Sequence, residues 1–148
     1  MNNATSSALG WIDDIEDATV SNGNFRTVLF TAKHIQLTVM SLAIGGNIGW
    51  EMHDHLDQFL RIESGTATLK LGRSSDEISE EHAVSDDWAM IIPAGIWHDV
   101  VNDGDSALKL YSVYGPPDHP DGTVHLTKAD AEEAEASEHD HHAATADD

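Results

Sequence analysis

Between residues 25 and 113 the chain is a succession of short apolar segments separated by turn residues, with no convincing helix pattern between them. The segments richest in Val, Leu, Ile and Thr lie at residues 26–31, 35–44, 58–63, 66–71, 88–92, 97–101 and 107–113. Several of them alternate apolar and polar residues, which is the period of a strand with one buried face. Many short strands at spacings of roughly 8–12 residues predict an all-β sandwich or barrel.

The rest of the 148 residues divides around this region, and the length favours one domain. Residues 1–24 are polar and are expected to form an N-terminal arm, followed by the barrel at residues 25–126. In residues 127–148, Thr127 and Asp130 resemble a capping pair, which predicts a short helix over residues 129–136. The remaining residues, 137–148, form a small, acidic, histidine-bearing tail that we expect to be disordered.

Two histidines, His53 and His55, stand one residue apart in a segment that reads as a further strand. Residues i and i+2 of a strand point to the same face, so both imidazoles are expected to aim at one point. His98 follows a turn formed by Pro93 and Gly95, at the start of a separate strand that can bring it to the same point. Three convergent imidazoles predict a site for a divalent metal.

Four further histidines have no partner in register and are expected at the surface or in loops: His34, His82, His119 and His125. The proline-rich turn at residues 116–120 is interpreted as closing the barrel end and not as a ligand loop.

With these residues in place, the chain resembles a single-domain cupin. The first motif of that family, Gly-x5-His-x-His-x3-4-Glu-x6-Gly, is matched at His53, His55 and Gly65. The second, Gly-x5-Pro-x-Gly-x2-His-x3-Asn, is matched at Pro93, Gly95, His98 and Asn102. Three positions depart from the pattern. Gln58 stands in the register of the motif glutamate, with a spacing from His55 one residue shorter than the pattern allows. The opening glycine of the first motif is Gly46, one residue early, and Asp87 replaces the opening glycine of the second motif.

The resemblance implies a double-stranded β-helix, the cupin jelly-roll barrel, with one metal in its mouth. It makes His53, His55 and His98 the ligands and Gln58 the fourth, with Leu60 and Ile62 sharing the inward face of Gln58. Imidazole and oxygen ligands suit Mn, Fe, Ni, Cu or Zn. A neutral Gln58 leaves the ligand set without a charge, which nearby acids such as Glu51 and Asp57 could restore in part from outside it.

The resemblance does not choose between functions. One candidate is a metal-dependent enzyme, an oxygenase or a sugar isomerase, acting on a small polar organic molecule in the barrel. The other is a non-catalytic module that binds a small molecule or uses the metal for structure. Because cupins commonly pair through edge strands, a homodimer is the expected assembly.

Composition excludes several other classes. Seven basic residues against 27 acidic ones give a net charge of −20, which repels nucleic acid and anionic membranes. There is no cysteine, so thiolate chemistry and disulfides are excluded. The first 24 residues do not resemble a secretory signal and no apolar run is long enough to span a bilayer, so we expect a cytoplasmic protein.

The acidic residues are spread along the chain, which predicts a protein adapted to a salty cytoplasm, where screening removes self-repulsion. The free energy of unfolding should therefore rise between dilute buffer and molar KCl. Urea unfolding at several KCl concentrations measures this. Equal stability in dilute buffer and in molar salt would leave an acidic protein with no salt adaptation.

Overall fold

The computed structural model describes residues 7–145, which form nine strands and two helices. In chain order the elements are α1 (Ile15–Val20), β1 (Arg26–Thr31), β2 (Gln36–Leu42), β3 (Asp57–Ser64), β4 (Thr66–Gly72), β5 (Glu80–Ser85), β6 (Ala89–Ile92), β7 (Trp97–Val101), β8 (Leu108–Gly115), β9 (Val124–His125) and α2 (Lys128–Thr145). The all-β prediction is confirmed, as is the inward face of Gln58, Leu60 and Ile62, all buried on β3.

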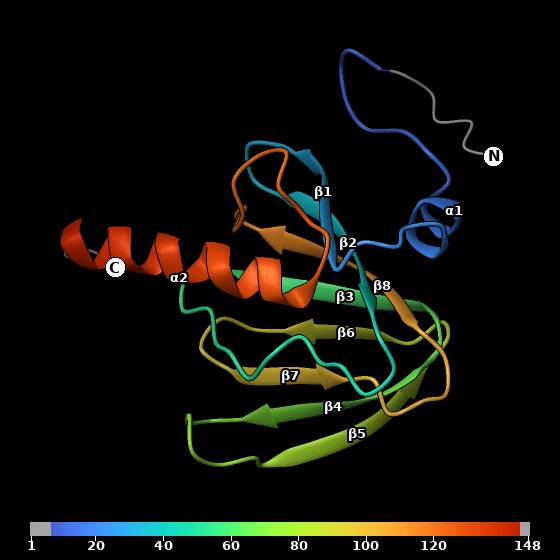
Figure 1. Cartoon of the computed structure of the whole chain (residues 1–148), viewed down its shortest axis with the longest axis vertical. Helices are drawn as coiled ribbons and strands as arrows, with labels where there is room; N and C mark the ends of the chain where they lie inside the picture. The colour runs from blue at the N-terminus through green and yellow to red at the C-terminus, as the bar shows by residue number, and fades with distance from the viewer. Residues whose placement is uncertain (1–6, 146–148) are drawn as a thin grey trace.

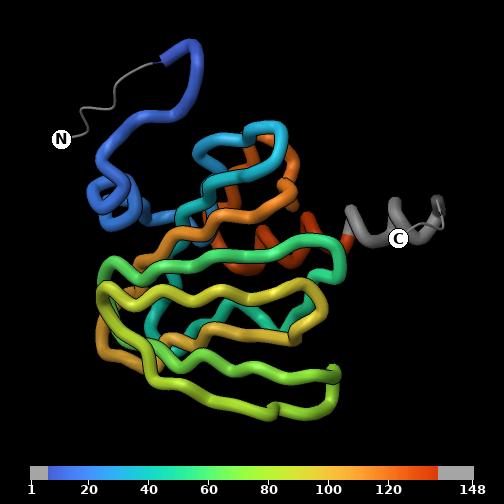
Figure 2. The backbone as a smooth tube through the Cα atoms, turned by 180° about the vertical axis from the view of Figure 1, so that it is seen from behind, coloured from blue at the N-terminus to red at the C-terminus, as the bar shows by residue number. Residues whose placement is uncertain are grey.

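The strands form two antiparallel sheets, one with the order β6-β3-β8-β2-β1-β9 and one with the order β5-β4-β7. Figure 1 shows β1 and β2 at one end of the long axis and β4 and β5 at the other, with α2 beside the larger sheet. Seen from behind, the strands are stacked in a layered barrel (Figure 2). No helix in the described part of the chain is both long and apolar enough to cross a bilayer.

The inward faces of the larger sheet change from apolar to polar along the strands. At one end, Leu42 of β2 pairs with Leu108 of β8, and the next inward pair along the same strands is Met40 with Leu110. Further on, Thr38 lies opposite Ser112, and Gln36 opposite Tyr114. Since antiparallel strands in fixed register carry their inward residues in layers, one end of the interior is hydrocarbon and the other is polar.

Strand β3 joins this arrangement on the other side of β8. Ile62 lies opposite Leu110, Leu60 opposite Ser112, and Gln58 opposite Tyr114. All of these side chains are buried, so the polar layer is enclosed and not solvated. Buried polar groups need partners, and this end of the barrel is therefore where a ligand or ion is physically useful.

The predicted strand through His53 and His55 is wrong. Residues 46–56 run as an irregular segment that touches β7 through two isolated bridges, Asn47 with Val101 and Glu51 with His98. Gly49 has a φ of +128° inside this segment, a conformation that L side chains rarely adopt and that a regular strand does not contain.

Two other elements differ from the sequence prediction. Strand β5 lies between the predicted strands at residues 66–71 and 88–92, where no strand was predicted. Its polar, mostly exposed residues hide the alternation, and only Val84 of this strand is buried. Helix α2 extends to Thr145, beyond the predicted end at residue 136, because its alanines and glutamates have high intrinsic helix propensity. Of the predicted tail, residues 146–148 lie outside the described part.

A buried asparagine ties the turn after β7 to the rest of the barrel. The side-chain amide of Asn102 donates to the carbonyl oxygens of Leu42 (3.0 Å), Ala43 (3.2 Å) and Ser106 (2.9 Å). Its oxygen accepts from the backbone N–H of Gly104 at 3.0 Å. One side chain thus satisfies four backbone groups at the apolar end, which gives a physical reason for asparagine at this motif position.

Replacing Asn102 by alanine should lower the free energy of unfolding by about 2–4 kcal/mol, because buried backbone groups lose their partners. Chemical denaturation of N102A beside the parent protein measures the loss. N102D, which has the same size and retains the acceptor, should recover only a small part of it. A loss below about 0.5 kcal/mol in N102A would show that the hydrogen bonds are unimportant.

Candidate metal centre

Backbone pairing places Glu51 and His98 side by side. The Glu51 N–H donates to the His98 carbonyl at 3.0 Å, and the His98 N–H donates to the Glu51 carbonyl at 2.8 Å. Two residues on, the carbonyl of His53 accepts from Gly95 N–H at 2.8 Å, in the turn that begins at Pro93. The turn predicted from Pro93 and Gly95 therefore holds His53 as well as leading into the strand of His98.

Three side chains meet at this point. Glu51 Oε2 lies 3.5 Å from His53 Nε2 and 3.7 Å from His98 Nε2. The ring centroids of the two histidines are 5.6 Å apart, and the three ligand atoms all lie within 4.8 Å of one another. Two ligands that each bind an ion at about 2.1 Å in a tetrahedral arrangement lie about 3.4 Å apart, so the spacing is that of a metal site.

The protonation of His98 suits a ligand. Its Nδ1 lies 3.0 Å from the backbone carbonyl of Ile96, an atom that can only accept. The hydrogen is therefore on Nδ1 and the neutral ring presents the lone pair of Nε2. Burial lowers the pKa of His98, which keeps the ring neutral at pH 7.

Several buried polar atoms at this end of the barrel make no hydrogen bond within the described structure. They are the Nε2 atoms of His53 and His98, Oε1 of Gln58, Oγ1 of Thr38 and Nε of Arg26. Buried polar atoms in folded proteins are nearly always paired with protein, water or an ion. These side chains therefore fit a bound ion and a polar ligand better than an unoccupied interior.

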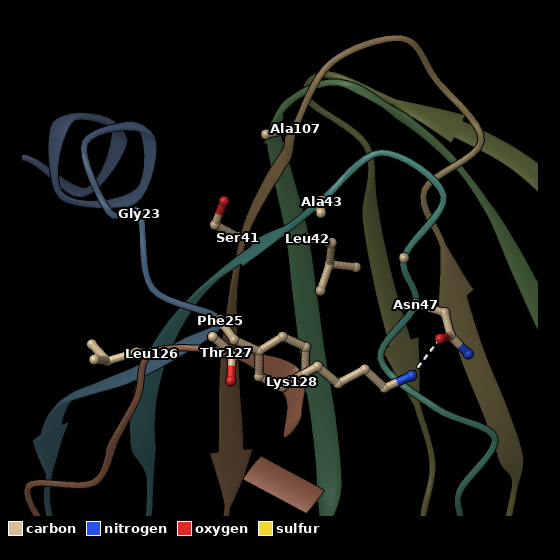
Figure 3. A pocket seen from close by; sticks show the side chains of 11 residues that line it. Gly23, Phe25, Ser41, Leu42, Ala43, Asn47, Ala107, Leu126, Thr127 and Lys128 are labelled. Atoms are coloured by element: carbon tan, nitrogen blue, oxygen red, sulfur yellow. Dashed lines mark hydrogen bonds between the residues drawn. The ribbon is translucent and has the colours of Figure 1, made fainter. Parts of the chain in front are cut away.

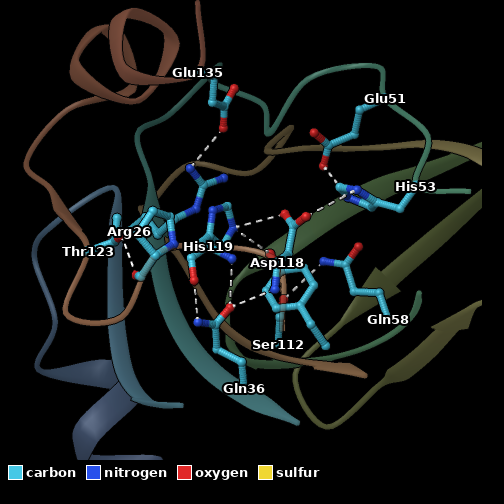
Figure 4. A network of polar contacts seen from close by, with 12 residues as sticks. Arg26, Gln36, Glu51, His53, Gln58, Ser112, Asp118, His119, Thr123 and Glu135 are labelled. Carbon is cyan, nitrogen blue, oxygen red and sulfur yellow. Dashed lines mark hydrogen bonds and ion pairs between the residues drawn. The ribbon is translucent and has the colours of Figure 1, made fainter. Parts of the chain in front are cut away.

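The structure brings together two of the four predicted ligands, His53 and His98, and adds Glu51. Gln58 is buried in the same polar layer, and its amide nitrogen donates to Ser112 Oγ at 3.3 Å, which leaves Oε1 available (Figure 4). His55 lies elsewhere: its side chain is 62% exposed and its Nδ1 is 3.1 Å from Asp54 Oδ1. Because residues 52–56 are not a strand, the alternation that would aim both imidazoles inward does not apply.

The electrostatics of the group couple Glu51 and His53. Burial raises the pKa of Glu51, but the imidazoles of His53 and His98 and the charge of Arg26 outweigh it and hold that pKa below its usual value. Burial lowers the pKa of His53, and the carboxylates of Glu51 and Asp118 reverse the shift and raise it. In the metal-free protein Glu51 and Asp118 therefore favour the protonated form of His53, and His53 favours the carboxylate form of Glu51.

A second layer of polar residues lies against this group, and the sequence analysis missed it. Asp118 Oδ1 is 3.9 Å from His53 Nδ1, and Asp118 Oδ2 is 3.5 Å from His119 Nε2. The side-chain oxygen of Gln36 accepts from the backbone N–H groups of Asp118 (3.1 Å) and His119 (2.9 Å), which fixes the loop over the barrel end (Figure 4). The 116–120 turn therefore closes the barrel as predicted and also delivers polar side chains to the site.

His119 lies in a loop, as predicted, but its side chain is not at the surface, and the surface-or-loop prediction for His125 is wrong. The His119 side chain is 8% exposed, with its Nε2 3.4 Å from the Tyr114 hydroxyl, and His125 is 9% exposed on β9. An acid and a histidine held between prolines, in Pro117-Asp118-His119-Pro120, was the sequence signal for a rigid functional loop.

A separate cavity of about 390 Å³ lies towards the apolar end, at the base of α2 (Figure 3). Phe25, Leu42 and Leu126 line it, together with the first residue of the helix, Lys128. Lys128 Nζ donates to Asn47 Oδ1 (Figure 3). The amide nitrogen of Asn47 in turn donates to Asp99 Oδ2 at 2.8 Å. None of the residues of the metal group lines this cavity, so it is a distinct feature.

Comparison with known proteins shows the family of this chain. The sequence pattern of the Cupin domain matches residues 38–114. This range contains β3 to β7 completely and most of β2 and β8. The chain belongs to the cupin family. This cupin is 54% identical over 125 residues to the uncharacterized protein YrkC of Bacillus subtilis, covering 84% of this chain and 67% of YrkC.

Two further relatives cover similar lengths. The uncharacterized protein L612 of Acanthamoeba polyphaga mimivirus is 35% identical, over 80% of this cupin and 72% of L612. The crystal structure of BH2720 from Bacillus halodurans superposes with a TM-score of 0.84 at 47% identity, covering 88% of this cupin and 98% of that chain.

The departures of this cupin from the family motifs have structural consequences. Asp87, at the position of the motif glycine, has a φ of +73°. Aspartate tolerates this left-handed conformation better than most residues, and the Asp87 carboxylate accepts from Arg61 Nη2 at 2.8 Å. A glycine is favoured at this position because the backbone requires a positive φ.

The burial of His119 predicts acid sensitivity. Burial, followed by the charges of Arg26, His125 and His53, lowers the pKa of His119 to about 3, against about 6.5 in an unfolded chain. Between these values only the unfolded chain binds the proton, so stability falls as the pH drops from about 6.5 towards 3, by up to about 1.4 kcal/mol per pH unit.

Replacing His119 by glutamine removes this proton uptake. The fall in the free energy of unfolding with decreasing pH should therefore become shallower by close to the contribution of one bound proton. Urea unfolding at pH 7, 6, 5 and 4.5 measures it. The matched control is H82Q, because His82 is 52% exposed and lies on β5, away from the site. Equal acid slopes in H119Q and the parent protein would contradict the burial of this imidazole.

Proposed function

We propose that this cupin binds one divalent transition metal through His53 and His98 with Glu51, and uses it to hold or transform a small polar organic ligand at the polar end of the barrel. The observation that carries the proposal is the pair of buried Nε2 atoms without hydrogen bonds, both facing one carboxylate oxygen. Gln58, with its buried Oε1, is the fourth proposed ligand.

The charge of the site supports this ligand set. Glutamine in place of the motif glutamate removes a carboxylate at position 58, and Glu51 supplies one from the irregular segment before His53. A divalent ion held by two neutral imidazoles is stabilised by one anionic ligand, as it is in sites that carry the motif glutamate. In this proposal the carboxylate has changed its position in the chain while the charge of the site is preserved.

The surrounding residues are suited to a polar ligand. A metal at this position supplies Lewis acidity to an oxygen atom of the ligand. Asp118 faces Nδ1 of His53 and can orient that ring, as carboxylates commonly do for metal-binding histidines. Thr38 and Tyr114 are buried on neighbouring inward positions, where their hydroxyl groups can select ligands with hydrogen-bonding atoms.

The first test is metal binding by single-residue variants. H98A, H53A and E51Q should each weaken binding of Mn, Ni or Zn by more than the about 10–100-fold expected for an outer-shell partner. Because Glu51 and Asp118 favour protonation of His53, metal binding should release protons, and calorimetry in buffers of different ionisation enthalpy gives a second readout. Thermal unfolding with and without chelator reports whether each variant folds.

His55 supplies the matched control. H55A removes the imidazole that the sequence motif predicts as a ligand, yet the structure leaves it exposed, so H55A should bind metal within about threefold of the parent protein. Loss of binding in H55A with retention in E51Q would establish the three-histidine set instead. Unchanged binding in H53A and H98A would exclude a metal centre at this position.

Whether the bound ligand is transformed is tested separately. Oxygen uptake and product formation by metal-loaded protein, with diketones, phenols and sugar acids as probes, distinguish an enzyme from a binding module. E51Q with metal supplied in excess is the control for chemistry that needs the complete site.

A further inference from the structure

A buried arginine lies beside the proposed metal centre. Arg26, on β1, is 3% exposed, and its Nη1 lies 3.1 Å from Glu135 Oε2 and 3.3 Å from His125 Nδ1. Its Nε is buried and makes no hydrogen bond within the described structure. A buried guanidinium is costly unless its donors are satisfied, so an incompletely paired one marks a place for an anion.

Arg26 acts on the same enclosed space as the metal group. Figure 4 shows it on the opposite side of Asp118 and His119 from His53 and Glu51. Its charge contributes to lowering the pKa of Glu51 and opposes protonation of His53 and His119, which places the guanidinium within electrostatic reach of all three. A ligand at this end of the barrel would therefore meet a fixed cation on one side and the metal group on the other.

The carboxylate that now pairs with Arg26 comes from a surface helix. Glu135 lies on α2 with its side chain 45% exposed. Burial raises the pKa of Glu135, Arg26 opposes this, and the acids Glu51 and Asp118 raise it further. Apart from the guanidinium, the surroundings disfavour a carboxylate here, so Glu135 is held mainly by Arg26.

The helix that carries Glu135 is loosely seated. Ala131 is its buried hydrophobic residue in the described part, and the cavity of about 390 Å³ lies beneath its first residue. A void removes packing contacts, and an acidic helix with little apolar surface has little to lose by moving. Displacement of Glu135 from Arg26 therefore needs only local opening of α2.

We propose that Arg26 is a carboxylate-binding site inside the barrel, and that Glu135 occupies it until the carboxylate of a small organic acid takes its place. Glu135 itself shows that a carboxylate fits Nη1, and the unpaired Nε–H, on the other edge of the guanidinium, offers a further donor to an anionic ligand. The inference assigns a ligand class to the proposed function.

The test uses metal-free, full-length protein, so that its failure and the failure of metal binding are distinguishable. Arg26, Arg61 and Arg73 are the only arginines of the chain, so three Nε–H signals are expected in NMR spectra and substitution assigns each of them. Malonate is titrated at constant ionic strength while the Arg26 Nε–H signal is followed. Hydrogen exchange of the α2 amides is measured in parallel.

Malonate should shift the Arg26 signal and speed exchange in α2. E135Q should bind malonate about three- to fivefold more tightly than the parent protein, because a competing ion pair is removed. E133Q removes the same charge from an exposed position of the same helix and should stay within about 1.5-fold of the parent protein. R26K keeps a positive charge but lacks the guanidinium donors, so malonate should no longer speed hydrogen exchange of the α2 amides in this variant.

Four outcomes would overturn the inference. The first is an Arg26 Nε–H signal that does not shift on addition of malonate in either the parent protein or E135Q. E135Q and E133Q could have equal effects, which would indicate general electrostatics. Weaker binding in E135Q would make Glu135 a residue that positions the guanidinium. Inorganic phosphate in place of malonate is the comparison arm, and tighter binding of phosphate would contradict the carboxylate assignment. If R26K does not fold, the comparison of malonate affinity between E135Q and E133Q still tests whether malonate competes with Glu135.

Discussion

The structure depends on a register that places unlike residues at the two ends of one closed interior. Inward positions of β2, β3 and β8 are leucine, methionine and isoleucine at one end, and glutamine, threonine, serine and tyrosine at the other. A shift of one residue in any of these strands would turn that strand's share of the polar layer outward. The apolar end supplies the hydrophobic stability, and the polar end holds atoms that need partners from outside the sheets.

The candidate metal centre is a consequence of that gradient. His98 enters the polar layer from β7, while Glu51 and His53 enter from an irregular segment that is held to β7 by backbone hydrogen bonds. An irregular backbone suits this task because it can turn an acid and a histidine towards one point without obeying the alternation of a strand. In our proposal it also moves the negative ligand from the motif position, where Gln58 stands, to Glu51.

The sequence predicted the elements whose alternation is regular. The inward face of Gln58, Leu60 and Ile62 follows from period two alone, and the turn at Pro93 and Gly95 follows from residue chemistry; Gly95 has a φ of +90°. The motif also singled out His53 and His98, which the structure brings together.

What the sequence could not predict depends on tertiary context. Nothing local distinguishes His53 from His55, because the departure from strand geometry at residues 46–56 depends on how that segment meets β7 and the Pro93 turn. The burial of His119 depends on Gln36, which lies 83 residues earlier in the chain. Strand β5 consists mostly of exposed polar residues, so its pairing with β4 is visible in backbone hydrogen bonds and not in its residue types.

The most direct test of the metal centre is to locate the ion. Crystals grown with manganese or zinc, and measured with X-rays at the absorption edge of that metal, give its position from anomalous scattering. The account predicts one strong peak within bonding distance of His53 Nε2, His98 Nε2 and an oxygen of Glu51. A peak bonded to His55, or the absence of any peak at the polar end of the barrel, would contradict it.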